Sequence, residues 1–433
     1  MATRIYTGGA ANVRDIVYLT PGGTVEVGDV FRVTLGVSQV EISASATTVA
    51  SVCTDLLAAL QDSEVAPEFT DIEWSVDNTT TPTKVIGTGP EDGRPIYASL
   101  AVATTEAGGG AADAQTFAKS NPTAATGSRD WNNVDNWSGA TLPTDTDTVY
   151  LGLYPEVPKY GLNQSGMTGC LTAIYVMNGA TSGLLIGLPK RNPTGYTEYL
   201  DRFLTIEVAT IYYGEGLGDN TPGMYLNANP GNTTIPVFQI KRTDNRDGDG
   251  NAPLVIKNAG TATWTISDCR GSVDIAPEPG DVLTLTTLVV GIGGDVRTGK
   301  GVSHVTITMN DGFLELNSEN AVTTLTMREG ASAVLNGNSG NITTIVMEPN
   351  TNIDYRRICT VTNFTSSGSI EFGNDNRSLT KTFTNVDLFA GASWNDPNQI
   401  ITTTNGIDLN RCGIEDVIVR IGKHRRITPG TVA

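Results

Sequence analysis

The stretch VTITMNDGFLEL (305–316) contains two short runs of alternating apolar and polar residues separated by a turn. Variants of it follow one another through the last third of the chain: LTLTTLVVG (283–291), VTTLTMREGASAVL (322–335) and ITTIVMEPNTNIDY (342–355). The apolar residues at the centre of each first run recur every 18 to 20 positions; they are Leu288, Ile307, Leu325, Ile345, Phe364 and Phe383. Self-similarity at a fixed short period is the signature of a solenoid.

A single coil of this kind cannot bury its own apolar face, so coils must stack and each strand must pair with its neighbour one period away. A leucine-rich repeat has a similar length, but its L-x-x-L-x-L-x-x-N frame is absent from the chain. The predicted fold class is therefore mainly β: a parallel β-solenoid (β-helix) of about 19 residues per coil. It covers at least 283–400 and extends back with less regular coils to about 145.

The first hundred residues have a different pattern. Residues 24–46 alternate like two strands, and strand-like stretches return at 69–76, 83–88 and 95–102. Between them, apolar residues recur with helical spacing; they are Val49, Val52, Cys53, Leu56, Leu57 and Leu60. This predicts one helix near 47–61 with Thr47 or Thr48 as its N-cap, and hence a small α+β domain.

These patterns divide the chain into three parts. An anchoring domain is expected over 1–105, and a linker over 106–128, where Gly, Ala, Ser and Thr are abundant. The solenoid is expected over 129–433, with a cap at its start near 129–150 and a C-terminal cap near 405–433.

Composition limits the function. The net charge is −18, which repels the phosphates of a nucleic acid. The one basic cluster, Lys423 to Arg426, is interpreted as a solvated end segment. Five widely spaced cysteines without a CxxC are typical of small buried hydrophobes in a protein made in a reducing cytoplasm. No signal peptide or apolar run of membrane-spanning length is seen, so no membrane insertion is expected.

The stretch SRDWNNVDNWSGATLP (128–143) holds two of the five tryptophans. Trp131 and Trp137 can be read as an exposed platform for sugar rings or as a plug that closes the first coil. A solenoid needs such a cap, because its first open coil would otherwise pair with other chains. The position of both residues at the start of the solenoid favours the cap.

The same stretch resembles known proteins. Its frame W-x5-W-S-G-x3-P-x3-D-x-V is similar to the opening segment of β-helix domains in bacterial surface proteins and phage structural proteins. GTVEVGDVFRVTLG, the helix ATTVASVCTDLLAAL and the closing NGIDLNRCGIEDVIVRIGKHRRITPG resemble uncharacterised virion-associated β-solenoid proteins of tailed bacteriophages and prophages. Together these blocks cover about a third of the chain.

The resemblance implies a structural component of a phage-type virion, made in the host cytoplasm: a fibre, a spike (tailspike-like) or a capsid or tail decoration protein. Self-association, with a homotrimer favoured, and contact with other virion proteins through the N-terminal domain are expected. The alternative is a glycan- or receptor-binding module or a polysaccharide depolymerase. For the binding module, Trp131, Trp137 or the tyrosines of GYTEYLDRF (195–203) and ATIYYGEG (209–216) would stack on host sugars.

Signs of catalysis are few, and no enzyme is expected. A nucleophilic triad needs a base, but only His304 and His424 exist and no G-x-S-x-G is present. Carboxylate pairs for polysaccharide cleavage, such as Glu207 with Glu215 or Asp268 with Asp274, stay open but unranked. GGDVRTGKG (293–301) has a P-loop skeleton but carries Gly301 where Ser or Thr should hold magnesium, and is interpreted as a solenoid turn.

One stretch resembles a calcium loop. In NRDGDGN (245–251), Asn245, Asp247, Asp249 and Gly250 match the start of the pattern, but Ile256 stands where a bidentate Glu is required. A solvated acidic turn is favoured, with calcium at these residues as the alternative. No catalytic, cofactor-binding or metal site is therefore predicted.

Overall fold

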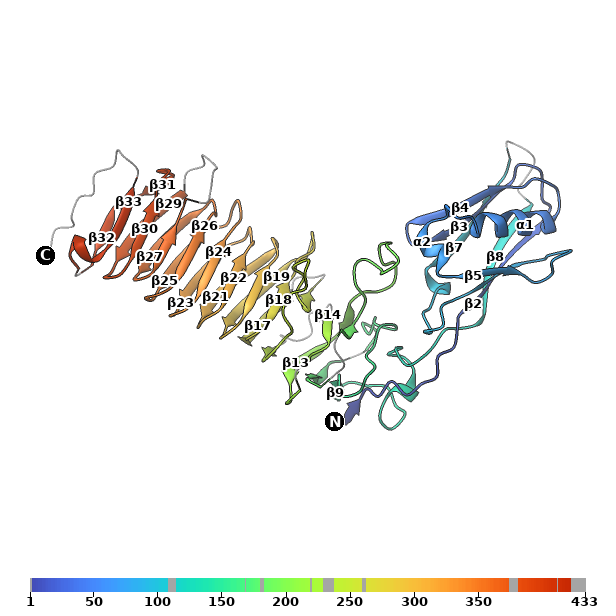
Figure 1. The fold of residues 1–433 in the computed structure, drawn as a ribbon, viewed down its shortest axis with the longest axis horizontal. Coiled ribbons are helices and arrows are strands. Elements are labelled where there is room, and N and C mark those ends of the chain that lie inside the picture. The colour runs from blue at the N-terminus through green and yellow to red at the C-terminus, as the bar shows by residue number, and fades with distance from the viewer. Residues whose placement is uncertain are drawn as a thin grey trace.

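The computed structural model describes residues 2–107, 114–167, 169–179, 183–218, 220–228, 237–258, 262–373, 381–410 and 412–421. It is mainly β, and a parallel β-solenoid of about 12 turns of roughly 21 residues dominates it, which confirms the predicted fold class. Figure 1 shows the solenoid as a straight stack of strands that ends near the C-terminus, with a small domain beside its N-terminal end.

Two parallel sheets run along the solenoid, and each regular coil gives one strand to each. The strands of the first sheet are β1 (Thr3–Ile5), β9 (Thr148–Leu151), β10 (Leu171–Met177), β13 (Val208–Glu215), β15 (Val237–Ile240), β17 (Ala262–Cys269), β19 (Leu283–Val290), β21 (Val302–Met309), β23 (Val322–Met327), β25 (Ile342–Met347), β27 (Thr360–Ser366), β29 (Lys381–Leu388), β31 (Ile401–Thr403) and β32 (Ile407–Leu409). The strands of the second sheet are β11 (Leu185–Ile186), β12 (Leu204–Ile206), β14 (Gly223–Ala228), β16 (Leu254–Lys257), β18 (Ser272–Ile275), β20 (Asp295–Thr298), β22 (Phe313–Leu316), β24 (Ser332–Leu335), β26 (Asn352–Tyr355), β28 (Ser369–Glu371), β30 (Ser393–Asp396) and β33 (Ile418–Ile421).

The predicted anchors lie in register, with one exception. Leu288 pairs with Ile307, and the column continues through Leu325 and Ile345 to Phe364. All of these side chains are buried. The next member is Val386 and not Phe383, which pairs with Val361 instead. The prediction was wrong there because the connection from β28 to β29 is longer, so this coil advances by more than one 19-residue step.

The small domain contains two antiparallel sheets and helix α1 (Val49–Leu60). One sheet has the order β5 (Glu73–Val76), β6 (Val85–Thr88), β2 (Ile16–Gly23), β8 (Gln115–Thr123), and the other β4 (Ser38–Ser43), β3 (Val30–Leu35), β7 (Leu100–Thr105). The Thr48 side chain accepts a hydrogen bond from Ser51 N, which confirms the predicted N-cap. One further turn of helix, α2 (Pro67–Thr70), was not predicted.

The predicted domain boundaries need two corrections. Strand β1 pairs in parallel with β9, so β1 belongs to the solenoid and the small domain is inserted between these two strands. Residues 115–123 form β8, which pairs with β2, so the central part of the predicted linker is a strand of a sheet; residues 108–113 lie outside the described residues. Small residues in an exposed edge strand look like a linker, because composition alone does not show pairing.

Aromatic clusters lie near both ends of the solenoid. At the N-terminal end, Trp137 packs edge-on against Trp131 and Tyr6, with ring centroids 4.7 and 5.0 Å apart. Near the C-terminal end, Phe364, Phe383 and Trp394 form a second cluster. The predicted C-terminal cap contains β32 and β33, which still pair as solenoid strands, and residues 422–433 lie outside the described residues.

The described part of the chain also contains three short 3₁₀ helices: η1 (Tyr97–Ser99), η2 (Val134–Asn136) and η3 (Ile414–Asp416). Among the described residues, no helix has the length and apolar character needed to cross a membrane.

Candidate functional site

Polar side chains from distant parts of the chain meet at the junction between the inserted domain and the solenoid. Two segments of the chain connect the inserted domain to the solenoid. They pair with each other through reciprocal backbone hydrogen bonds between Val13 and Thr126. The buried Asn136 ties both to the cap, because its side chain accepts from Ala10 N and donates to Gly127 O. The domain therefore sits on a short stalk.

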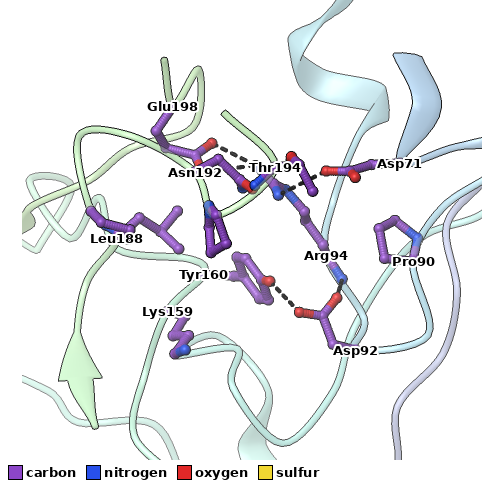
Figure 2. A pocket seen from close by; sticks show the side chains of 12 residues that line it. Asp71, Pro90, Asp92, Arg94, Lys159, Tyr160, Leu188, Asn192, Thr194 and Glu198 are labelled. Atoms are coloured by element: carbon purple, nitrogen blue, oxygen red, sulfur yellow. Dashed lines mark hydrogen bonds and ion pairs between the residues drawn. The ribbon is translucent and has the colours of Figure 1, made fainter. Parts of the chain in front are cut away.

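A second connection comes from the loop between β11 and β12 (187–203), here called the docking arm. It reaches from the solenoid to the inserted domain, and Figure 2 shows its Glu198 facing Arg94 of the domain. Arg94 donates to both carboxylate oxygens of Glu198, at 2.7 and 2.8 Å. Glu198 also accepts from the backbone N–H groups of Tyr199 and Leu200, so its position on the arm is fixed.

Aromatic rings surround this ion pair. The guanidinium of Arg94 lies 5.2 Å from the ring centroid of Tyr199 and 5.5 Å from that of Tyr196. The Tyr196 hydroxyl donates to Asp71 of the domain at 2.8 Å. The side chain of Glu198 is fully buried and that of Arg94 is only 8% exposed. Breaking such a pair leaves an uncompensated buried charge, so the pair specifies how the domain sits.

A further set of contacts lies beside it. The Tyr160 hydroxyl of the solenoid donates to Asp92 of the domain at 2.7 Å, as Figure 2 shows. Arg129 lies 3.8 Å from Asp92 and 2.9 Å from Glu156. Lys159 is the remaining cation here, and burial, with repulsion from Arg129, lowers its pKa.

These side chains enclose a cavity of about 400 Å³. Its carboxylates are already committed: Asp71 and Glu198 to Arg94, and Asp92 to Tyr160. No histidine or cysteine lines the cavity. The arrangement therefore suits a mechanical task, the fixing of one domain orientation, better than acid–base or nucleophilic chemistry.

The structure answers the question raised by the two tryptophans. Trp131 and Trp137 are 1% and 2% exposed, and the Trp137 indole N–H donates to Trp131 O at 2.8 Å. Neither ring offers a face to a sugar. The cap interpretation is confirmed. The third aromatic residue of the cap, Tyr6, directly follows strand β1 and was not identified from the sequence.

The two tyrosine-rich stretches are also structural. Tyr196 and Tyr199 of 195–203 belong to the docking arm described above. In 209–216, Tyr212 stacks on Tyr175, and Tyr175 stacks on Tyr150, with centroids 4.5 and 4.8 Å apart and nearly parallel rings. In this ladder both faces of Tyr175 and one face each of Tyr150 and Tyr212 are covered by a neighbouring ring, so these tyrosines stack on one another along the solenoid.

The two suggested carboxylate pairs are not brought together as catalytic pairs. Glu207 precedes β13 and Glu215 ends it, a separation of roughly 25 Å along an extended strand, well beyond the span of a glycosidase pair. Asp268 pairs with Arg270 at 2.8 Å, whereas Asp274 pairs with Arg246 at 2.7 Å on the other sheet. Sequence reasoning did not single out Arg94, Glu198 or Arg246, since nothing local marks an arginine whose partner lies far along the chain.

The remaining candidates fall in turns or in the core. Asp247 accepts from the N–H groups of Asp249 and Asn251, which is an acidic turn closed on itself. Among the described residues, no group of three or more His, Cys, Asp or Glu side chains that could hold a metal ion is found. The P-loop-like stretch was interpreted as a solenoid turn, and this was wrong for its centre, where Asp295–Thr298 form strand β20 of the second sheet. His304 is buried in β21, and Lys423 to Arg426 lie outside the described residues.

Comparisons of the chain with protein-family models, with curated proteins and with solved structures found no match.

Proposed function

We propose that the chain is a structural, non-enzymatic component of a phage-type virion, in which the solenoid projects as a fibre, spike or decoration from the inserted domain. The observation that carries the proposal is the combination of a stiff rod with a domain fixed at one end of it. With strands spaced at about 4.8 Å, the first sheet alone is roughly 60 Å long.

Two features support a rod that does not polymerise through its ends. The N-terminal coil is closed by Tyr6, Trp131 and Trp137, and a second aromatic cluster lies near the last coils. The domain, in contrast, exposes apolar side chains at the tips of its turns: Val27 is 62% and Val37 is 89% exposed. Such tips are suited to contact with another virion protein.

The test is to look for the chain in particles purified from lysates of its source organism, by immunogold labelling and by quantitative mass spectrometry. A constant copy number per particle is expected. A variant in which a short linker replaces residues 14–125 retains the paired stalk ends and should not be incorporated. Absence of the wild-type chain from purified particles would overturn the proposal.

A glycan-binding function is favoured by a separate feature, a groove on the second sheet. This second proposal is limited to binding and does not include cleavage of the polysaccharide. Release of reducing sugar from a bound polysaccharide would show that the chain is also a depolymerase.

A further inference from the structure

A groove of about 700 Å³ crosses the outer face of the second sheet, larger than the cavity at the junction. Its floor is formed by strands β18, β20 and β22, and its wall by the loop 276–282 that connects β18 to β19. The lining contains no aromatic ring and only three apolar side chains, Pro277, Pro279 and Val282. Every other lining residue is polar, charged or glycine.

Ion pairs and prolines fix the position of the wall loop. Glu278 at its centre is held by Arg202 at 2.8 Å and by Lys257 at 2.9 Å, both from preceding parts of the chain. Prolines on either side of Glu278 restrict the backbone further. The groove is therefore formed before any ligand arrives, which lowers the entropic cost of binding.

The glycines of the P-loop-like stretch allow the wall loop to pack closely against strand β20 and the turn after it. A Cβ at Gly299 would overlap the carbonyl of Ala276, and a Cβ at Gly301 would overlap the carbonyl of Asp281. The loop thus lies directly on the TGKG segment, and glycine is required there for the close approach of two backbones. The phosphate-loop pattern is explained by this contact.

The floor presents hydrogen-bonding groups in a row. Asp274, Arg297 and Glu315 are neighbours in register on adjacent strands, with their side chains on the outer face. Arg297 Nε lies 3.2 Å from a Glu315 oxygen, and Asp274 is held by the nearly buried Arg246 at 2.7 Å. The row therefore offers fixed donors and acceptors at intervals of about 4.8 Å.

One carboxyl group at the wall has few partners. Asp281 is 7% exposed and lines the groove, and its carboxylate accepts from the backbone N–H of Glu278 at 3.2 Å. No cation forms an ion pair with it among the described residues. Asp281 therefore retains acceptor capacity toward a ligand.

We propose that this groove binds a segment of an uncharged oligosaccharide, whose hydroxyls donate hydrogen bonds to Asp281 and Glu315 and accept them from Arg297. This activity goes beyond the structural role proposed above and does not depend on it. The ring C–H faces of the sugar would lie along Pro277, Pro279 and Val282.

The lining distinguishes this ligand from others. Glu278 and Asp274 are neutralised by Arg202, Lys257 and Arg246, and the other charged lining residues are two carboxylates and two cations, so the groove has no marked excess of charge to hold an anionic polymer. A peptide would find neither a deep apolar pocket nor a free strand edge, because β18, β20 and β22 are paired on both sides. A polyhydroxyl ligand can instead use carboxylate, guanidinium and amide groups at once.

The probe is a glycan array holding neutral, uronic-acid-containing and sulfated oligosaccharides, applied to the full chain. The strongest neutral binder is then titrated by calorimetry. We expect retention of neutral members and at least tenfold weaker binding in Asp281→Asn and in Glu315→Gln. Val282→Arg, at a 48% exposed position, should block the groove without disturbing the fold.

The matched control is Asp354→Asn, because Asp354 lies in the same outer column as Glu315, two strands further along and outside the groove. It should bind as the wild type does. Failure to retain any neutral saccharide, a preference for anionic members, or unchanged binding in all three groove variants would each overturn the proposal. The virion proposal is tested separately by particle composition, so one can fail without the other.

Discussion

Arg356 and Arg357 are adjacent in the sequence, yet they occupy opposite environments. Arg356 is 42% exposed and pairs with Asp354 at the surface. Arg357 is fully buried, and its guanidinium donates to the carbonyl groups of Ser318, Asn320, Asn336 and Gly340. These carbonyls belong to the turns of the two preceding coils, so one side chain ties three coils together. Sequence alone does not distinguish the two arginines.

Substitution tests this difference. Arg357→Met leaves several buried carbonyls without a donor, at about 1–3 kcal/mol each. We therefore expect a loss of about 3 kcal/mol or more in the free energy of unfolding, measured by chemical denaturation. Arg356→Met, the control, should lose less than about 1 kcal/mol. Equal effects of the two substitutions would show that Arg357 does not hold the coils.

His304 gives the solenoid a dependence on pH. It lies between Leu285 and Val322 in the first sheet, and neither ring nitrogen has a hydrogen-bond partner. Burial, with a smaller contribution from the charge of Arg357, lowers its pKa to about 3. The folded chain therefore holds His304 neutral at pH values where the unfolded chain, with a pKa near 6.5, already binds a proton.

The sign follows from this difference. Stability from the neutral His304 is complete above pH 6.5 and is lost as the pH falls toward 3, by about 1.4 kcal/mol per pH unit. At pH 5 the cost is about 2 kcal/mol. His304→Leu, which continues the Leu285–Val322 column, should remove this part of the acid sensitivity. Denaturation series at pH 7 and pH 5 would refute the idea if variant and wild type lost equal stability.

At the scale of elements, repetition is what the sequence reveals best. The column from Leu288 to Phe364 could be predicted because equal coil lengths place equivalent residues one above another. The step to Val386 could not be, because a longer connection changes the count and Phe383 has the same apolar character. Strands β2 and β8 were missed for a related reason: they pair across about 100 residues of chain.

The candidate site shows the same limit more strongly. Arg94 and Glu198 are 104 residues apart in the chain, and neither stands in a recognisable motif. For the tyrosines beside Glu198 the sequence offered only an alternative, stacking on sugars, and it did not reveal the inserted domain that they contact. Contacts between separately folded parts depend on their final placement, which local patterns do not encode.

The coupling energy between Arg94 and Glu198 can be measured by a double-mutant cycle on the free energy of unfolding. Arg94→Met alone should lower this free energy by about 3–5 kcal/mol, because Glu198 stays buried and unpaired. The double variant with Glu198→Gln should lose less than the sum of the single changes. Small-angle scattering should show a looser domain in Arg94→Met.

The exposed pair Arg32–Glu41, inside the domain, is the control, and Arg32→Met should change stability by less than about 1 kcal/mol. Additive effects of the Arg94 and Glu198 changes would mean that the two side chains are not coupled.

At the scale of the whole molecule, the two sheets present different outer faces. From β19 to β27, the outward side chains of the first sheet form two uncharged columns; they are Thr287, Thr306, Thr324, Thr344 and Asn363 in one, and Val289, Thr308, Thr326, Val346 and Thr365 in the other. The second sheet carries Asp274, Arg297 and Glu315 in its outer column. A flat uncharged face in a chain of net charge −18 is where copies can approach without repulsion.

This face makes the homotrimer testable. Exposed large apolar side chains of the solenoid, such as Leu217 and Ile292, lie in separate turns, whereas Val305 is exposed on β21 of the first sheet. We therefore expect packing between copies to use this sheet with its threonine and valine columns. We expect a molar mass near three times 45.6 kDa by light scattering.

Thr326→Arg, on β23, should shift the molar mass toward that of one chain, because three buried arginines would lack partners. Val334→Arg, on the outer face of β24 in the same coil, should leave it unchanged. A wild-type monomer would instead favour a decoration protein that assembles only on its particle, and equal dissociation by both variants would mean that the first sheet is not the contact face.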